Sequence, residues 1–340
     1  MKKLMVLCLS LFLGIGVLTG CAKEKVTENG EGASKETKKA TEVSVITPDG
    51  LPSMAIAKLI KEKPEIKKDY NVKYSISATP DDLSTQVMKG SADIAIVPSN
   101  MAAIAYNKNK ESKSSDYVIA GTAGFGSFYL VSTEDLGGFD GLKGKTIVNT
   151  GKGLTPDITF QAILKEKGLN PESDVTLDYV NAVSELVPML VSGKATTAVV
   201  PEPALSGLMT KKPDVKIIGN LNDEYKKANK SEFGYPQSTV IVKSSFLKEN
   251  KEFVDAFLTH VSDSIKWAKE NPKDLGAYSK EVGIQSEPAI IEKSMERSNL
   301  DFEPIKTNKD EYIKYFQCLF DFNPKSLGGS MPDEGIFMEK

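Results

Sequence analysis

Histidine, arginine, tryptophan and cysteine are all scarce in this chain of 340 residues. It contains one histidine, one tryptophan, three cysteines and, among 43 basic residues, a single arginine, Arg297. His260 alone cannot form a histidine metal cage and leaves little room for histidine catalysis, and clamps of paired arginines are excluded. No two cysteines have metal-binding spacing, so we predict neither a metal centre nor a disulfide framework.

The charge balance is nearly even, with 43 Lys and Arg against 46 Asp and Glu and a formal net charge of −3. This mild acidity does not favour a nucleic-acid surface built on basic patches. Apolar residues make up 40% of the chain, enough for a folded core. At roughly 150 residues per domain, the length indicates about two domains.

The first 20 residues have the pattern of a secretory signal. Two lysines at positions 2–3 precede an apolar run over residues 4–18, which is too short to span a membrane comfortably. The run closes with Leu18-Thr19-Gly20-Cys21, which resembles the bacterial lipobox. The resemblance implies a lipoprotein signal peptide over residues 1–20 and acylation of Cys21, with palmitate-type chains holding the protein on the extracytoplasmic face of the cell membrane. The alternative is an ordinary signal peptide with a chance cysteine.

Residues 21–40 follow as a predicted tether. They are mostly Lys, Glu, Thr, Gly, Ser and Ala, with Val26 as the one large apolar residue after Cys21. Such a composition cannot offset the entropy of folding. About 20 flexible residues have a typical end-to-end distance of roughly 25 Å, so the body is expected to stay near the membrane without being fixed to it.

The body contains an internal repeat with a constant offset. Gly50-Leu51 corresponds to Gly153-Leu154, the Gly-x-Ala at 90–92 to that at 193–195, and residues 95–98 to residues 198–201, always 103 positions apart. Several segments in one register indicate a shared supersecondary plan. Each copy predicts the order strand, helix, strand, helix, strand. The predicted elements are 43–46, 53–60, 72–76, 80–90 and 94–97, then 146–148, 156–168, 175–180, 184–192 and 197–200.

Two such copies predict an α/β fold with two lobes, each built on a mostly parallel sheet. Ligands bind such sheets outside the carboxyl ends of the strands, so facing lobes make a cleft. Two β-rich stretches, 128–133 and 238–242, are expected to carry the chain between the lobes as hinge strands. We therefore place lobe one at residues 41–130 plus 243–340 and lobe two at 131–242. The C-terminal part is predicted to be helical, with His260 and Cys318 in apolar stripes as packing residues.

Nucleotide motifs are incomplete, so no cofactor is predicted. Gly144-Lys145-Thr146 lacks the earlier glycine of a phosphate loop, because Phe139 stands there. Gly151-Lys152-Gly153 lacks the third glycine of a dinucleotide fingerprint, because that position is Pro156.

Loops at predicted strand ends instead lead into helices, whose unpaired N–H groups can hold polar or anionic groups without arginine. The loops are 48–53, 78–82, 98–100, 151–157, 181–185 and 201–204.

Five short motifs, in this order behind a lipobox, resemble the solute-binding lipoproteins of bacterial ABC importers. The group contains binders of sulfonate, taurine, nitrate and thiamine-pyrimidine precursors, and the resemblance covers nearly the whole mature chain. The motifs are Pro48-Asp49-Gly50-Leu51-Pro52-Ser53, the block 90–97, the block 142–147, Pro201-Glu202-Pro203 and the block 323–329.

The resemblance implies a type II periplasmic-binding-protein fold that closes on one small solute. It implies delivery of that solute to an ABC permease and its ATPase by a monomeric protein that is not an enzyme. The ligand-binding residues carried over by position are Asp49, Leu51, Pro52, Ser53, Ser99, Asn100, Thr155, Pro156 and Glu202.

The ligand and two other functions stay open. Poverty in arginine, histidine and tryptophan departs from the family pattern and argues against a strongly anionic ligand. Asp49, Asp157 and Glu202 can accept hydrogen bonds from ring or amine N–H groups, so a sulfonate-type anion competes with a pyrimidine, another heterocycle or an amine. A lyase-type enzyme with Asp49 or Glu202 as general acid or base, and a sensory surface lipoprotein, are the alternative functions.

Overall fold

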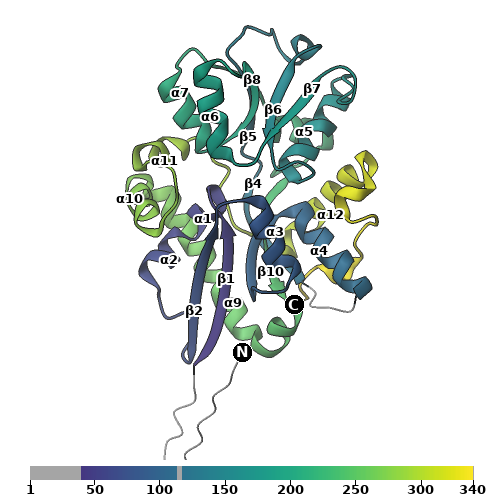
Figure 1. Cartoon of the computed structure of the whole chain (residues 1–340). Coiled ribbons are helices and arrows are strands. Elements are labelled where there is room, and N and C mark those ends of the chain that lie inside the picture. Colours follow the sequence, from purple (N-terminus) through teal and green to yellow (C-terminus); the bar gives the residue numbers. More distant parts are fainter. Residues whose placement is uncertain (1–39, 113–116, 340) are drawn as a thin grey trace, which may run out of the picture. The chain divides into compact units, whose positions relative to one another are not determined.

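Strands from distant parts of the chain form two separate sheets, each flanked by helices (Figure 1). The computed structural model describes residues 40–112 and 117–339, without the side chains of 109–112, and these residues belong to one compact unit, Lys39–Lys340. The predicted signal peptide, Cys21 and the tether up to residue 39 lie outside the described residues. Within them, no helix is long and apolar enough to cross a membrane.

The first sheet, which defines lobe one, has six strands in the order β11-β4-β10-β3-β1-β2. Strand β1 pairs in parallel with β2 and β3, whereas β10 is antiparallel to both β3 and β4. The strands are β1 (Thr41–Pro48), β2 (Tyr70–Ser77), β3 (Ile94–Pro98), β4 (Tyr117–Phe125), β10 (Pro236–Lys243) and β11 (Glu303–Pro304).

The second sheet, which defines lobe two, has five strands in the order β7-β6-β8-β5-β9. It repeats the first sheet, because β6 is parallel to β7 and β8 while β5 is antiparallel to β8 and β9. The strands are β5 (Phe128–Ser132), β6 (Thr146–Thr150), β7 (Thr176–Val180), β8 (Thr197–Pro201) and β9 (Lys216–Asn220).

Helices follow the strands in both lobes, and four more come after the last long strand. In lobe one they are α1 (Leu51–Ala55), α2 (Ala57–Glu62), α3 (Pro80–Met88) and α4 (Ser99–Ser112), and in lobe two α5 (Thr155–Glu166), α6 (Val183–Ser192), α7 (Ala204–Lys211) and α8 (Leu221–Asn229). The C-terminal helices are α9 (Ser244–Glu270), α10 (Pro272–Val282), α11 (Pro288–Ser294) and α12 (Ile305–Phe322), and the 3-10 turns are η1 (Phe139–Leu142), η2 (Pro324–Leu327) and η3 (Glu334–Ile336).

The predicted repeat is present in the structure. Strand β3 at 94–98 and strand β8 at 197–201 are separated by 103 residues at both ends, and α3 and α6 begin 103 residues apart. The first predicted helix, 53–60, is split into α1 and α2 at Ile56, whose φ of −117° is not helical. The duplicated α/β plan is therefore real even where single elements differ.

The chain passes between the lobes earlier than predicted. Residues 128–132, expected to be a hinge strand, form β5 inside the second sheet, and residues 236–243 form β10 inside the first. Sheet membership thus changes near Gly126 and near Tyr235, ahead of the expected boundaries at 130/131 and 242/243. The two passages touch, because Gly126 N–H donates to the Tyr235 carbonyl at 3.1 Å.

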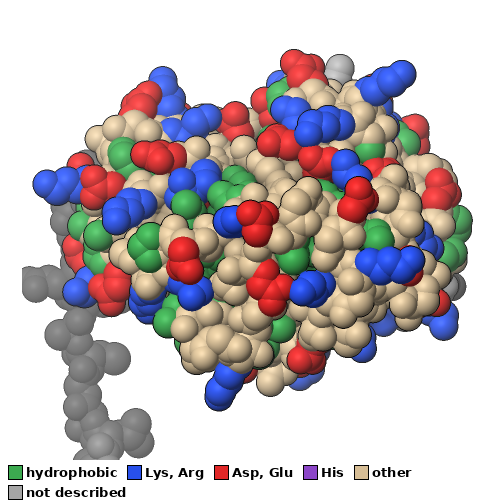
Figure 2. Space-filling view, turned by 90° about the horizontal axis from the view of Figure 1, so that it is seen from above, with side chains coloured by type: hydrophobic (Ala, Val, Ile, Leu, Met, Phe, Trp, Pro, Cys, Tyr) green, Lys and Arg blue, Asp and Glu red, His purple; other side chains and the backbone are tan. Residues whose placement is uncertain are grey.

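Apolar side chains explain how the elements pack. The predicted stripe on α9, including Phe253, Phe257 and Val261, is buried against the outer side of the first sheet, whereas His260 is only half-buried. Burial raises the pKa of the half-buried Cys318 thiol to about 11, which fits a packing role. On the face seen in Figure 2, basic and acidic side chains are intermixed rather than gathered by sign.

Candidate functional site

A cavity of about 500 Å³ lies between the lobes, at the carboxyl ends of the parallel strands. Strands β1 and β3 of lobe one and β6 and β8 of lobe two end in its wall, and each is followed by a turn into a helix. Ligand pockets of small molecules have volumes of about 300 to 1,000 Å³. The cavity is therefore the position at which this topology is expected to bind a solute.

The cavity wall is mainly apolar and rich in proline. Eight prolines line it, and a proline residue has no backbone N–H to donate. Charged groups are few: Asp49, Glu202 and Glu287 are the acids, and the exposed Lys211 is the one cation among the described lining residues. The lining prolines are Pro48, Pro52, Pro80, Pro98, Pro156, Pro188, Pro201 and Pro203.

Four of the residues expected at the site do line the cavity: Asp49, Pro52, Pro156 and Glu202. The other five are not part of its lining and have structural partners. Leu51 is buried in the core of lobe one, and the Ser53 hydroxyl donates to the Gly50 carbonyl at 2.8 Å. The Ser99 hydroxyl contacts the Pro236 carbonyl and, at 2.7 Å, the Thr239 hydroxyl.

Asn100 and Thr155 join the lobes instead of facing the cavity. Thr155 N–H donates to Asn100 Oδ1 at 2.8 Å, and Asn100 Nδ2 donates to the Gly153 carbonyl at 2.8 Å. Both side chains are fully buried. This contact fixes the start of α4 against the start of α5 on one flank of the cavity.

Glu202 lines the cavity but its carboxylate already has partners. Arg297 Nε donates to Glu202 Oε1 at 2.6 Å, and Ser206 donates to both oxygens, from its N–H at 3.0 Å and its hydroxyl at 3.1 Å. Burial raises the pKa of Glu202, and the hydrogen bonds from Arg297 and Ser206 oppose that rise. Arg297 follows α11, which packs against α7, so this ion pair joins the lobes on the opposite flank.

Asp49 is a partly buried lining acid that accepts no hydrogen bond from another side chain, whereas the third acid, Glu287, is exposed. Asp49 follows directly on β1, is half-buried, and accepts one long hydrogen bond from Gln285 N–H at 3.3 Å. Burial raises its pKa above the ordinary range, opposed by hydrogen bonds from the backbone of Gln285 and Gly50. Its carboxylate has room for a further donor.

The helix N-termini at the cavity, which were expected to hold polar or anionic groups, already have partners within the chain. Helices α3, α5, α6 and α7 begin beside an acid of their own, and in three of them that carboxylate accepts a backbone N–H. The pairs are Gly153 N–H to Asp157 at 2.8 Å for α5, Ala182 N–H to Glu185 at 3.0 Å for α6 and Ser206 N–H to Glu202 at 3.0 Å for α7; α3 has Asp81 and Asp82 in its first turn. Helix α4, which follows Pro98 of the wall, has no acid in its first turn, and its Asn100 N–H donates to the Thr155 hydroxyl at 3.2 Å.

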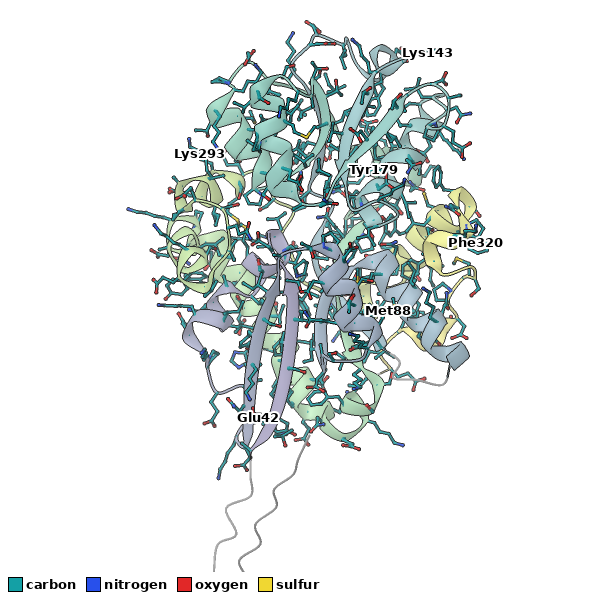
Figure 3. All side chains as sticks on the ribbon, in the orientation of Figure 1. Glu42, Met88, Lys143, Tyr179, Lys293 and Phe320 are labelled. Atoms are coloured by element: carbon teal, nitrogen blue, oxygen red, sulfur yellow. The ribbon has the colours of Figure 1, made fainter. Side chains whose placement is uncertain are left out.

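Asp157, considered earlier as a ligand contact, lies in a different groove. Besides Gly153 N–H, it accepts hydrogen bonds from Gln161 at 3.0 Å and from the Tyr179 hydroxyl at 2.9 Å. Figure 3 shows Tyr179 in lobe two, the upper of the two lobes in that view. Its carboxylate caps α5 and does not face the cavity.

Thr150 is a lining residue that the sequence did not single out. It is the last residue of β6, is 4% exposed, and its hydroxyl has no hydrogen-bond partner among the described residues. A buried hydroxyl without a partner is costly, so a ligand atom is its natural partner. The position at a strand's carboxyl end was a usable signal, but the predicted loop began one residue later.

The segment 285–287 is a second missed part of the wall. It connects α10 and α11 and comes from a region that was expected only to pack. Among the described residues, no group of three or more His, Cys, Asp or Glu side chains is arranged to hold a metal ion.

Known proteins with this arrangement are binding proteins and transporter components. The putative binding protein YtlA of Bacillus subtilis (strain 168) is 26% identical over 220 residues, 64% of this chain and 63% of the relative. The match thus spans less than two thirds of that relative's length. A crystal structure of an ABC transporter from Parabacteroides distasonis is 28% identical and covers 88% of this chain and 99% of its own, with a TM-score of 0.74.

The fold also extends to more distant relatives. The periplasmic aliphatic sulphonate binding protein SsuA from Escherichia coli has a TM-score of 0.70 at 13% identity, over 89% of this chain and 93% of its own. The fold is that of type II periplasmic-binding proteins, as the resemblance implied. A family model described as NMT1/THI5 like matches residues 67–275, more than half of the chain, so the protein belongs to this family.

Proposed function

We propose that this protein captures a small organic solute in the interlobe cavity and delivers it to an ABC importer. The observation that carries the proposal is the cavity itself, enclosed by the strand ends of two duplicated lobes. The relatives support it, since they are named as a binding protein, an ABC transporter and a sulphonate binding protein. The partners are then the solute, a permease and its ATPase, and the protein acts as a monomer.

The two flanking contacts suggest how solute capture works. The contacts of Asn100 with Thr155 on one side, and of Arg297 with Glu202 on the other, link residues of the two lobes, so separation of the lobes would break both. A solute that contacts both lobes adds to these contacts and favours the closed state by its differential affinity for it. The closed state is then the form presented to the permease.

Native mass spectrometry of the full chain, isolated from its own cells in mild detergent, tests the binding function. We expect a retained small molecule in stoichiometric amount, and loss of uptake of that molecule when the gene is deleted. Absence of any retained solute, together with unchanged uptake in the deletion strain, would contradict the proposal. Adjacent genes for a permease and an ATPase would separate an importer component from a sensory lipoprotein.

A lipid anchor at Cys21 is the second part of the proposal. It rests on the lipobox-like residues 18–21 behind an apolar run. Two acyl chains hold a protein firmly on a bilayer, whereas one chain does so only marginally. We expect Cys21→Ala to move the protein from the membrane fraction to the soluble fraction, while Cys318→Ala stays with the membrane. A Cys21→Ala protein that remains membrane-bound and unprocessed would be evidence for a different attachment.

A lyase-type enzyme is less compatible with the site. Its general acid or base was expected at Asp49 or Glu202, but both Glu202 oxygens are hydrogen-bonded to neighbours. Steady turnover of a bound solute that Glu202→Gln abolishes, with the fold intact, would favour the enzyme over the binder.

A further inference from the structure

Anions find little to bind in the interlobe cavity. The helices α3, α5, α6 and α7, each of eight residues or more, contribute their first turns or preceding residues to the wall. The positive end of each is offset by an acid of its own chain. Helix α4, which follows Pro98 of the wall, has no such acid, but its Asn100 N–H already donates to the Thr155 hydroxyl. Of the two cations near the cavity, Arg297 is bound to Glu202 and Lys211 lies exposed.

Backbone donors are also reduced in the wall. Eight of its residues are prolines, which have no N–H group, and several of them stand where a helix begins. Hydroxyl and amide donors such as Ser184, Ser286 and Gln285 do line the cavity, but the one lining cation, Lys211, is exposed. An anion entering the cavity would therefore lose hydration without gaining a buried cation in return, which is costly. The wall therefore disfavours anions because it offers them no available buried cation.

Two acceptor groups in the same wall remain available. Asp49, in lobe one, accepts only long or backbone hydrogen bonds, and the buried Thr150 hydroxyl in lobe two has no partner among the described residues. Apolar side chains such as Phe128, Leu154 and Val187 form much of the remaining surface. A carboxylate in an apolar wall favours a ligand that has a positive charge and an apolar body.

We propose that the solute is an organic ammonium ion with an apolar body, and that Asp49 is the residue that selects it. The inference rests on the proposed binding function and narrows it to one ligand class. Asp49 accepts hydrogen bonds from the ammonium group, the proline-rich wall packs on the apolar body, and Thr150 binds a second polar atom of the ligand. Sulfonates and other anions are excluded by the acids at the helix ends.

Three probes with one carbon skeleton and different charge test the class. They are 2-phenylethylammonium, 2-phenylethanol and 2-phenylethanesulfonate, titrated calorimetrically into the full chain in mild detergent at pH 7.5. We expect the ammonium probe to bind more tightly than the alcohol, and the sulfonate to show no binding. Tighter binding of the sulfonate, or binding of none of the three, overturns the assignment.

Variants of Asp49 test the residue. Asp49→Asn should weaken the ammonium probe about ten- to hundredfold and the alcohol much less, because only the ammonium probe loses a charge–charge attraction while Asn still offers an acceptor oxygen. Asp49→Glu, which keeps the charge, should retain the preference for the ammonium probe over the alcohol. The matched control is Asp140→Asn, an exposed acid outside the cavity lining, with less than a twofold effect.

Equal binding of the ammonium probe by the wild type and Asp49→Asn, with both folded by circular dichroism, would refute the role of Asp49. The binding function is judged separately by the retained solute. A retained anion would leave that function standing and overturn the ammonium class, whereas a retained amine would support both.

Discussion

The two lobes share one strand order, but the acidic residues near the cavity have different hydrogen-bond partners in each lobe. In lobe two, Asp157, Glu185 and Glu202 each accept a backbone N–H at the start of a helix. In lobe one, the Thr79 hydroxyl caps α3, and Asp49 beside the short α1 accepts no side-chain hydrogen bond. The duplicated plan thus gives two corresponding surfaces: in lobe two the three acids bind backbone N–H groups at helix starts, and in lobe one Asp49 has no side-chain partner.

Removal of Arg297, the partner of an acid in lobe two, should change the stability of the protein more than any other substitution described here. Arg297→Gln leaves the buried Glu202 carboxylate without its cation, which we expect to lower the free energy of unfolding by about 3 kcal/mol at pH 8. Burial already raises the pKa of Glu202, and loss of Arg297 raises it further, so the carboxyl group is protonated more readily in the folded variant. The penalty should therefore shrink as the pH falls from 8 to 5.

Urea denaturation at both pH values measures that penalty. Lys293→Gln is a matched control, because it removes an exposed cation from the adjacent helix α11 and should change stability by less than about 0.5 kcal/mol. An Arg297→Gln penalty of equal size at pH 5 and pH 8 would show that the ion pair with Glu202 is not its cause.

Substitution of the helix-capping side chains of α3 in lobe one and α6 in lobe two should reduce stability by smaller amounts, with a different salt dependence in each lobe. Thr79→Ala removes the neutral cap of α3 and should cost about 1 kcal/mol, with little dependence on salt. Glu185→Gln keeps a hydrogen-bond acceptor at α6 but removes the charge, so about 0.5 kcal/mol is expected at low salt and less at 0.5 M salt. Thermal unfolding at two salt concentrations compares the stability losses of the two variants. A stronger salt dependence for Thr79→Ala than for Glu185→Gln would contradict the assignment of a neutral cap to α3 and a charged cap to α6.

Asp49 should give the smallest change in stability. Because burial raises the pKa of Asp49 in the folded state, the stability that this group contributes is present below its unfolded pKa and is lost as the pH rises through the folded value. Asp49→Asn should therefore be slightly more stable than the wild type at pH 7, with the difference vanishing near pH 3. A variant less stable at pH 7 would mean that Asp49 has a structural partner there.

The fold could be predicted from the sequence further than the site could. Glycine and proline positions and the apolar runs recur every 103 residues, and the backbone geometry of α3, β3, α6 and β8 follows from those local signals. The lobe boundaries were harder to predict from the sequence, because the β-rich composition of β5 and β10 does not indicate which sheet each strand joins.

The partners of the site residues depend on contacts between distant parts of the chain. Asn100 looked like a ligand contact at a strand end, but its partner Thr155 lies 55 residues away in the other lobe. Glu202 likewise faces Arg297, 95 residues further on. Four of the nine residues that the resemblance indicated line the cavity, while the direction of each side chain depends on tertiary packing that no local pattern encodes.

The contact between the two interlobe passages limits how the protein can move. A Cβ atom at Gly126 would overlap the ring of Tyr235, so the two passages are in close contact at these residues. Because a hydrogen bond also links them there, we expect the two passages to act as one pivot rather than as two independent joints. We therefore expect any swing of one lobe against the other to have a single axis, so that a pair of spin labels far from it would report the motion as one distance.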